Sequence, residues 1–309
     1  MPDTTASAPV QLAVRGPFDL AASTRFLEGF APADRPDAAA EPGVLRLAFP
    51  AEDGWVPVGA AVRQRDGAVT VELTGAVGDP EAVVAQVTRI LSIDVDGSGF
   101  ADVGRRDPVV AELQARYPGL RPVQFHSPYE AACWAIIGQR VRITQAAAVK
   151  ARLAEQLGVS VIVAGPSLTC FPGPQQLRDQ PIPGLPATKV ERLLAVADAA
   201  LEGRLAATRL RSLSTDDALA QLTQIPGIGP FSAQLVLARG AGHPDLFPTA
   251  ERRLHEEMAH AYSLDQPTID QLTAIADGWR PYRTWVGLLL RTRREDDTAE
   301  ISRGGPRRG

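Results

Sequence analysis

The stretch QIPGIGPFSAQLVLARG, residues 224–240, places two prolines and two glycines within five residues, with a helical pattern on each side. The Pro-Gly-Ile-Gly sequence at 226–229 ends the first helix, for which Thr215 is the expected N-terminal cap. Pro230 suits the first position of the second helix, because a proline there loses no helical hydrogen bond. The stretch therefore predicts two helices joined by a tight hairpin.

A hairpin of this composition can bind an anion through its backbone. Glycines allow the chain to approach a ligand closely, and the first N–H groups of the second helix have no acceptor within that helix. A DNA phosphate would satisfy these amides without any cationic side chain. A tight turn between two packed helices that bind nothing produces the same pattern, so residues outside the hairpin are needed to separate the two interpretations.

Length and composition restrict the class of protein. With 309 residues, 45% of them hydrophobic, the chain is long enough for about two domains. Its N-terminus lacks the basic and apolar segments of a secretion signal, and its apolar runs are short, which predicts a cytoplasmic protein without membrane association. Two cysteines, Cys133 and Cys170, are too few for a disulfide framework or an iron–sulfur cluster.

Charge is unevenly distributed along the chain. The formal net charge of −4 argues weakly against a nucleic-acid partner, but it divides into −7 over residues 1–120 and +3 over residues 121–309. The basic residues are almost all arginine, so that Lys150 and Lys189 are the only lysines. Very few amines are therefore available for chemistry.

The first hundred residues predict a small α+β domain. Short β-rich segments are separated by polar turns that contain glycine, and segments with apolar residues at helical spacing lie on both sides of them. The expected strands are 44–50 and 68–75, and the expected helices lie within 18–30 and 79–93.

Helical patterns dominate from about residue 108 onward. Residues 127–130, Ser-Pro-Tyr-Glu, have the form of a capping box and open a helical pattern that Gly158 would end. Apolar residues are nearly absent after residue 294. We therefore predict an α+β domain at 1–108, an all-α core containing the helix-hairpin-helix at 109–294, and a disordered tail at 295–309.

Three segments in order, PYEAACWAIIGQRV (128–141), IPGIGPFSAQLVLARGAGHPDLFPTAERRL (225–254) and WRPYRTWVGLLL (279–290), resemble the 3-methyladenine DNA glycosylase II family of the helix-hairpin-helix superfamily. RILSIDVD at 89–96 and the α+β segment extend the resemblance over most of the chain. It implies that the helical part is a glycosylase core, acting as a monomer in the cytoplasm on the nucleoid. The implied substrate is double-stranded DNA with a damaged base, which the enzyme flips out and excises.

The same resemblance implies which residues meet the DNA. Hairpin carbonyls are expected to hold a monovalent cation, Na⁺ or K⁺, which bridges to phosphate, and no side-chain metal site is expected. Arg140 takes the position of the residue that fills the space left by the flipped base, although a phosphate contact or a solvated charge is equally compatible with it. The implied DNA contacts are Gly227, Ile228, Gly229, Phe231, Ser232, Gln139 and Arg140.

The superfamily contains lysine-using enzymes and water-activating enzymes. In the lysine users the amine lies two residues after the second hairpin glycine, where this chain has Phe231. Lys150 and Lys189 lie on helical patterns well before the hairpin. A Schiff base, and with it strand-cleaving lyase activity, is therefore not expected.

Counting from Phe247-Pro248 places Glu251 where the family has its catalytic aspartate. A carboxylate there would stabilise positive charge that develops on the sugar and would orient or deprotonate water. A surface acid in the first turn of a helix capped by Thr249 explains the same residue without catalysis. Asp245 matches a second acid of the family motif and is the weaker catalytic candidate.

The family stacks an electron-poor alkylated base on aromatic rings. Phe231 matches one such position, but Arg291 replaces the pocket tryptophan and Arg253 lies where an apolar residue is expected, which puts the lesion in doubt. For Phe231, Trp279 and Trp285, ordinary core packing is the competing interpretation. The residues expected to line the base pocket are Phe231, Leu235, Arg253, Trp285 and Arg291.

The segment HEEMAH at 255–260 has the look of a zinc motif, but its histidines are five residues apart, about 140° around a helix, and do not share a face. The sequence as a whole predicts a monofunctional DNA glycosylase that removes alkylated or otherwise damaged bases by water attack assisted by a carboxylate. A non-catalytic protein that binds damaged DNA on the same scaffold is the alternative, because Glu251 and Arg291 both depart from the family pattern.

Overall fold

The computed structural model describes residues 7–33, 38, 40–182 and 184–299. Its N-terminal part is a four-stranded antiparallel sheet in the order β1-β4-β3-β2. The β3–β4 turn is Asp66-Gly67, and both residues have positive φ, as a two-residue hairpin requires. The predicted strands at 44–50 and 68–75 are confirmed, and two strands were missed. The strands are β1 (Val10–Leu12), β2 (Val44–Pro50), β3 (Pro57–Arg65) and β4 (Ala68–Gly75).

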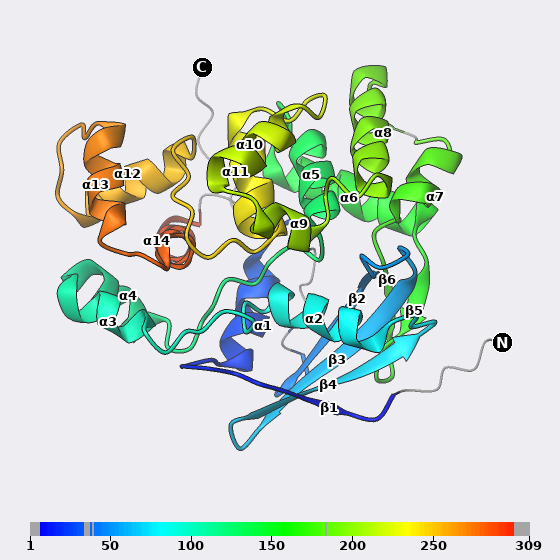
Figure 1. The fold of residues 1–309 in the computed structure, drawn as a ribbon, viewed down its shortest axis with the longest axis horizontal. Helices are drawn as coiled ribbons and strands as arrows, with labels where there is room; N and C mark the ends of the chain where they lie inside the picture. Colours follow the sequence, from blue (N-terminus) through cyan, green and yellow to red (C-terminus); the bar gives the residue numbers. More distant parts are fainter. Residues whose placement is uncertain (1–6, 34–37, 39, 183, 300–309) are drawn as a thin grey trace.

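Two helices pack on this sheet, as their apolar spacing predicts. α1 (Leu20–Gly29) and α2 (Pro80–Ile90) begin at Asp19 and Asp79, whose carboxylates accept hydrogen bonds from amides of the first turn. Their apolar faces and the inward residues of the strands form one buried cluster. Figure 1 shows this layer below the helical part of the chain.

The helical part that carries the hairpin has its own core. Ser127 caps its first helix through the Glu130 amide, but the expected reciprocal bond is wrong, because the Glu130 side chain is buried against Lys150 and His126. A small strand pair, β5 (Ser160–Ile162) with β6 (Ser167–Thr169), was not predicted and packs on the sheet. The helices are α5 (Pro128–Ile137), α6 (Ile143–Leu157), α7 (Pro174–Asp179), α8 (Ala187–Leu201), α9 (Ala207–Ser212), α10 (Thr215–Thr223), α11 (Pro230–Leu235) and the π-helical turn η1 (Val236–Gly240).

A third cluster joins two helices that follow the sheet layer in sequence to the last three helices of the described chain. Trp279 and Trp285 lie at its centre and are fully buried, so the core interpretation of both rings is confirmed. The predicted boundary after residue 108 falls just inside a helix that shares this cluster with the helix before it. Its helices are α3 (Phe100–Arg106), α4 (Pro108–Arg116), α12 (Arg252–Ala261), α13 (Ile269–Asp277) and α14 (Arg283–Thr298).

The last helix is longer than its composition predicts. α14 continues to Thr298, so the expectation of a disordered tail is wrong for residues 295–298, and residues 300–309 lie outside the described part of the chain. Polar contacts with α4 replace the missing apolar ones: Arg116 pairs with Asp297 at 2.6 Å, and the Tyr117 hydroxyl donates to Asp296 at 2.7 Å. In the described residues, no helix is long and apolar enough to cross a membrane.

The sheet layer is tied to the hairpin core by buried charge. The Arg89 guanidinium on α2 donates to the carbonyls of Gly240 and His126 and pairs with Glu52. The Glu52 carboxylate also accepts the Ala207 amide at the start of α9. Because a buried guanidinium is costly unless each N–H finds an acceptor, these bonds fix how the two parts meet.

Candidate active site

The predicted helix-hairpin-helix is formed by α10 and α11. α10 begins one residue earlier than expected, with Ser214 rather than Thr215 as its cap. Pro230 is the first residue of α11, as predicted. Gly227 has φ +88°, and a Cβ there would lie 2.5 Å from the Arg192 side chain, so glycine is required by both conformation and packing.

The outer side of the hairpin is open. Gly229 has an ordinary φ of −88°, and a Cβ there would meet no atom within 4 Å. The first bond within α11 is donated by the Ala233 amide to the Gly229 carbonyl, which leaves the Phe231 and Ser232 amides ahead of the helical ladder. The space over Gly229 is therefore open to an anion that approaches these amides.

The loop at 138–142, between α5 and α6, lies against the hairpin. The Gln139 side-chain amide donates to the Gly227 carbonyl at 2.7 Å, and its oxygen accepts from Arg192 at 2.6 Å. Gln139 is thus engaged within the protein in this structure, whereas the sequence predicted a contact with DNA. Arg140 is exposed and has φ +57°, a conformation that a non-glycine residue adopts only when its neighbours hold it there.

Glu251 lies at the start of α12, with one difference from the prediction. It occupies the cap position itself, and the Thr249 hydroxyl instead accepts a hydrogen bond from Gln234 on α11 at 2.9 Å. The Gln234 side-chain oxygen also accepts the Ala250 amide at 3.0 Å. α11 therefore positions both the hairpin amides and the segment that leads into Glu251.

Arg291 is the ion-pair partner of Glu251. Its Nε lies 2.8 Å from Glu251 Oε1, and the two side chains are 20% and 28% exposed. The pair joins α14 to the start of α12, so two of the three residues that depart from the family pattern contact one another. Because both side chains keep access to solvent, a ligand could reach either of them.

A second cation, Arg239, lies in the field of this pair. It belongs to η1, and π-helical turns are frequent at functional sites. Its guanidinium donates to the Val123 carbonyl at 2.6 Å and lies 4.9 Å from the centre of the Phe30 ring. Burial lowers the pKa of Arg239 to about 10, the charge of Glu251 opposes that effect, and the charge of Arg291 adds to it. The charges of Arg291 and Arg239 thus both act on the Glu251 carboxylate. The sequence pattern around Glu251 did not predict the contribution of Arg239.

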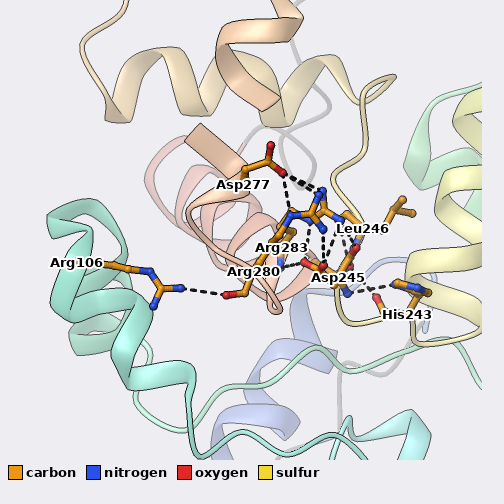
Figure 2. A network of polar contacts seen from close by, with 8 residues as sticks. Arg106, His243, Asp245, Leu246, Asp277, Arg280 and Arg283 are labelled. Carbon is orange, nitrogen blue, oxygen red and sulfur yellow. Dashed lines mark hydrogen bonds and ion pairs between the residues drawn. The ribbon is translucent and has the colours of Figure 1, made fainter. Parts of the chain in front are cut away.

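Asp245 is held in a network of arginines, which Figure 2 shows from close by. Arg283 Nε lies 2.7 Å from one carboxylate oxygen, and Arg280 Nη1 lies 3.0 Å from the other. Arg283 also donates to the Asp245 main-chain carbonyl at 2.7 Å. With both carboxylate oxygens occupied, this geometry supports a role for Asp245 in fixing the loop before α12 and does not support catalysis.

The expected pocket residues separate into two groups. Phe231 is 50% exposed at the start of α11, while Leu235 and Arg253 are half-buried. Trp285 is 2% exposed and packs against Tyr282 and Phe100, so in this structure its ring is part of the buried core. The sequence did not indicate whether Trp285 would face the core or a pocket, because the segment TWVGLLL is apolar on all sides of the helix.

Both lysines are engaged away from the hairpin amides. Lys150 is buried, with its amine 2.6 Å from Glu130 and 2.7 Å from the Pro32 carbonyl. Burial alone raises the pKa of Glu130, but the charges of Lys150 and His126 outweigh it and hold that pKa well below its usual range. Lys189 donates to the Ile137 carbonyl at the end of α5. In the described part of the chain, no group of three or more His, Cys, Asp or Glu residues is arranged to hold a metal ion.

Comparison with known proteins agrees with this arrangement. No family model matches the chain. DNA-3-methyladenine glycosylase of Bacillus subtilis is 24% identical over 216 residues, covering 68% of this chain and 71% of that protein. DNA-3-methyladenine glycosylase 2 of Escherichia coli is 31% identical over 186 residues, covering 59% of this chain and 63% of that protein.

The fold is also shared. The solved 3-methyladenine DNA glycosylase of Archaeoglobus fulgidus superimposes with a TM-score of 0.76 at 20% identity, over 96% of this chain and 100% of that one. The likeness therefore covers the sheet layer as well as the helices. Together with the hairpin and the acid at the start of α12, these similarities show that the chain is related to the DNA-3-methyladenine glycosylases.

Proposed function

We propose that this protein is a monofunctional DNA glycosylase that excises alkylated or otherwise damaged bases from double-stranded DNA. One observation carries the proposal: α11 presents open hairpin amides at its start and, through Gln234, holds the segment that leads into Glu251. A phosphate bound at the hairpin would therefore be in a fixed relation to the carboxylate. Fixed geometry of this kind is what a positioned reaction requires.

The proposed reaction is hydrolysis of the glycosidic bond. As the bond between the sugar carbon and the base nitrogen breaks, its electron pair leaves with the base and positive charge develops on the sugar. Glu251 stabilises that charge and orients or deprotonates the water whose oxygen bonds to the same carbon. Arg291 holds the carboxylate in place, and Arg140 enters the space that the flipped base leaves.

The hairpin carbonyls are suited to a monovalent cation, because neutral oxygens are the donors that such an ion takes. The Gly227 carbonyl already accepts from Gln139, and the Ile225 carbonyl accepts the Ile228 amide, so an ion would share these oxygens with internal hydrogen bonds. Na⁺ or K⁺ at this position stays part of the proposal, and the steps above do not depend on it.

The hairpin assignment is tested by Gly229→Asp. The new carboxylate would project into the open space over the α11 amides, where it would repel phosphate and compete for the same N–H groups. Affinity for undamaged and damaged duplex should fall together by about tenfold, in a fluorescence titration at fixed salt. Gly229→Ala is the matched control and should bind like wild type. Equal affinity of a folded Asp variant and wild type would refute phosphate binding at this site.

The reaction class is tested by borohydride trapping. With Phe231 in the position of the lysine nucleophile and both lysines bonded to other elements, we expect no covalent complex with DNA and an abasic product whose strand stays intact. The measurement is denaturing electrophoresis of labelled duplex after reaction with and without borohydride. An adduct of wild type that Lys150→Met or Lys189→Met abolishes would show a lysine mechanism instead.

A non-catalytic binder of damaged DNA is the second candidate. The Glu251–Arg291 ion pair is the observation in its favour, because a carboxylate already paired with a guanidinium is a weaker stabiliser of a sugar cation. The names of the curated relatives do not favour it, since these are glycosylases. Release of free base from defined lesions in duplex DNA separates the two candidates.

A further inference from the structure

The start of α8 contacts both loops of the proposed DNA-binding face. Lys189 and Arg192 are three residues apart and so lie on one side of this helix. The Lys189 amine donates to the Ile137 carbonyl at 2.7 Å, at the end of α5 where the helix dipole favours a cation. The Arg192 guanidinium donates to Gln139 Oε1 at 2.6 Å. α8 thus holds both the end of α5 and the loop at 138–142 that follows it.

Arg192 contacts the hairpin as well. A Cβ added to Gly227 would lie 2.5 Å from Arg192 Cδ and 2.9 Å from Arg192 Cγ. The methylene stem of Arg192 therefore packs closely on the hairpin backbone. Its guanidinium at the same time fixes Gln139, whose amide nitrogen donates to the Gly227 carbonyl. A side-chain amide can accept a hydrogen bond from one group and donate one to another. Gln139 therefore links α8 to the hairpin through the loop at 138–142.

Arg140 is the residue next to this link. It is exposed and has φ +57°, in the left-handed region that is unfavourable for a non-glycine residue. Such a conformation persists when adjacent residues are fixed, and Gln139 is the adjacent residue that is fixed here. Release of Gln139 would therefore free Arg140 to leave the orientation in which it projects from the protein.

We propose that Arg192 is a positioning residue that acts through Gln139, holding Arg140 in a fixed relation to the hairpin. Binding of phosphate at the hairpin and insertion of Arg140 into the duplex are then one concerted step. This inference rests on the proposed function, because it assigns Arg192 to base flipping. Arg192 itself need not touch DNA.

The test uses Arg192→Met, which keeps a stem to pack on Gly227 and removes the guanidinium. Duplex with 2-aminopurine beside a lesion reports unstacking by its fluorescence, whether or not a base is excised. We expect the unstacking amplitude to fall about fivefold or more while affinity for undamaged duplex changes less than about twofold. Arg178→Met, which removes one charge and an exposed ion pair with Asp198, is the matched control and should flip like wild type.

Two further variants separate positioning from a loss of structure. Gln139→Leu should reproduce the Arg192→Met defect, and the double variant should be no worse than either single one, because both break the same link. In an Arg140→Ala background, Arg192→Met should have little further effect. Thermal melting of each variant checks the fold, and a folded Gln139→Leu protein keeps the test valid if Arg192→Met does not fold.

The outcomes distinguish this inference from the proposed function. If Arg192→Met and Gln139→Leu both unstack the duplex like wild type, Arg192 has no positioning role, and the glycosylase proposal is unaffected. If the effects of Arg192→Met and Arg140→Ala on unstacking are fully additive, Arg192 again has no positioning role, and the glycosylase proposal is unaffected. If wild type unstacks the base, both variants fail to do so, and no lesion is excised, the positioning role stands and the glycosylase proposal falls. A wild-type protein that unstacks no base overturns both.

Discussion

Replacing Glu251 by glutamine is expected to slow single-turnover base excision by about a hundredfold or more, with little change in DNA affinity. Glutamine keeps the shape of the side chain, and its oxygen can still accept the hydrogen bond from Arg291 Nε, which lies 2.8 Å from Glu251 Oε1. The negative charge opposite the developing sugar cation is lost. Release of free base from a duplex with one defined lesion, with enzyme in excess, measures the chemical step directly.

The companion change Glu251→Asp tests the geometry of the site. Shortening the side chain by one methylene draws the carboxylate away from Arg291, and a displacement of about 1 Å can lower a positioned reaction by a large factor. We expect the aspartate variant to be slower than wild type. Equal loss of binding and excision in the glutamine variant would show instead that the start of α12 had been damaged. If wild type and both variants bind DNA and none of them releases a base, the protein is a binder.

Replacing Arg291 by methionine is expected to change which lesions are removed. Arg291 is the cation that contacts Glu251, so its removal exposes the full charge of the carboxylate to a bound base. Two unit charges about 7 Å apart interact by roughly 2 kcal/mol at an effective dielectric constant of about 20. The ratio of excision rates for a cationic alkylated base and a neutral damaged base should therefore rise by about tenfold or more.

Arg294→Met is the matched control for this experiment. Arg294 lies one turn further along α14 and pairs with Glu256 of α12 at 2.8 Å, so the control removes an equivalent bond between the same two helices. It should leave the lesion ratio unchanged. Competition between the two lesions in one reaction gives the ratio without a correction for protein stability. An unchanged ratio in Arg291→Met would place Arg291 outside the site that discriminates between bases.

Local sequence chemistry was sufficient for the elements that are fixed by backbone requirements. Pro230 at the first position of α11 and the glycine needed at 227 follow from φ restrictions and missing donors. The start of α12 beside Glu251 was also found to within two residues, since the cap is Glu251 and not Thr249. These features depend on residues that are adjacent in the chain, and their patterns can therefore be recognised without knowledge of the packing.

Side-chain roles that depend on distant contacts could not be predicted in the same way. Trp285 was expected in the base pocket, but the face of α14 that carries it is covered by Phe100 and Tyr282. Gln139 was expected on DNA, but its oxygen accepts from Arg192 on α8 and its nitrogen donates to the Gly227 carbonyl of the hairpin. The sequence of an apolar helix does not indicate which of its faces will be covered by other elements. The presence of a side-chain amide likewise does not indicate which groups will form hydrogen bonds with it.

The sequence by itself determined the hairpin, the place of the acid and the absence of a lysine at Phe231, because each is a property of a short segment. Only the tertiary structure decided that Arg291 pairs with Glu251, that Arg239 adds a second charge and that Gln234 joins the acid to the hairpin helix. The residues in these three interactions, one of which is purely electrostatic, are 40, 12 and 16 positions apart, respectively. Charge and hydrogen bonding act through space, so the environment of the carboxylate is set by how α11, η1, α12 and α14 pack together.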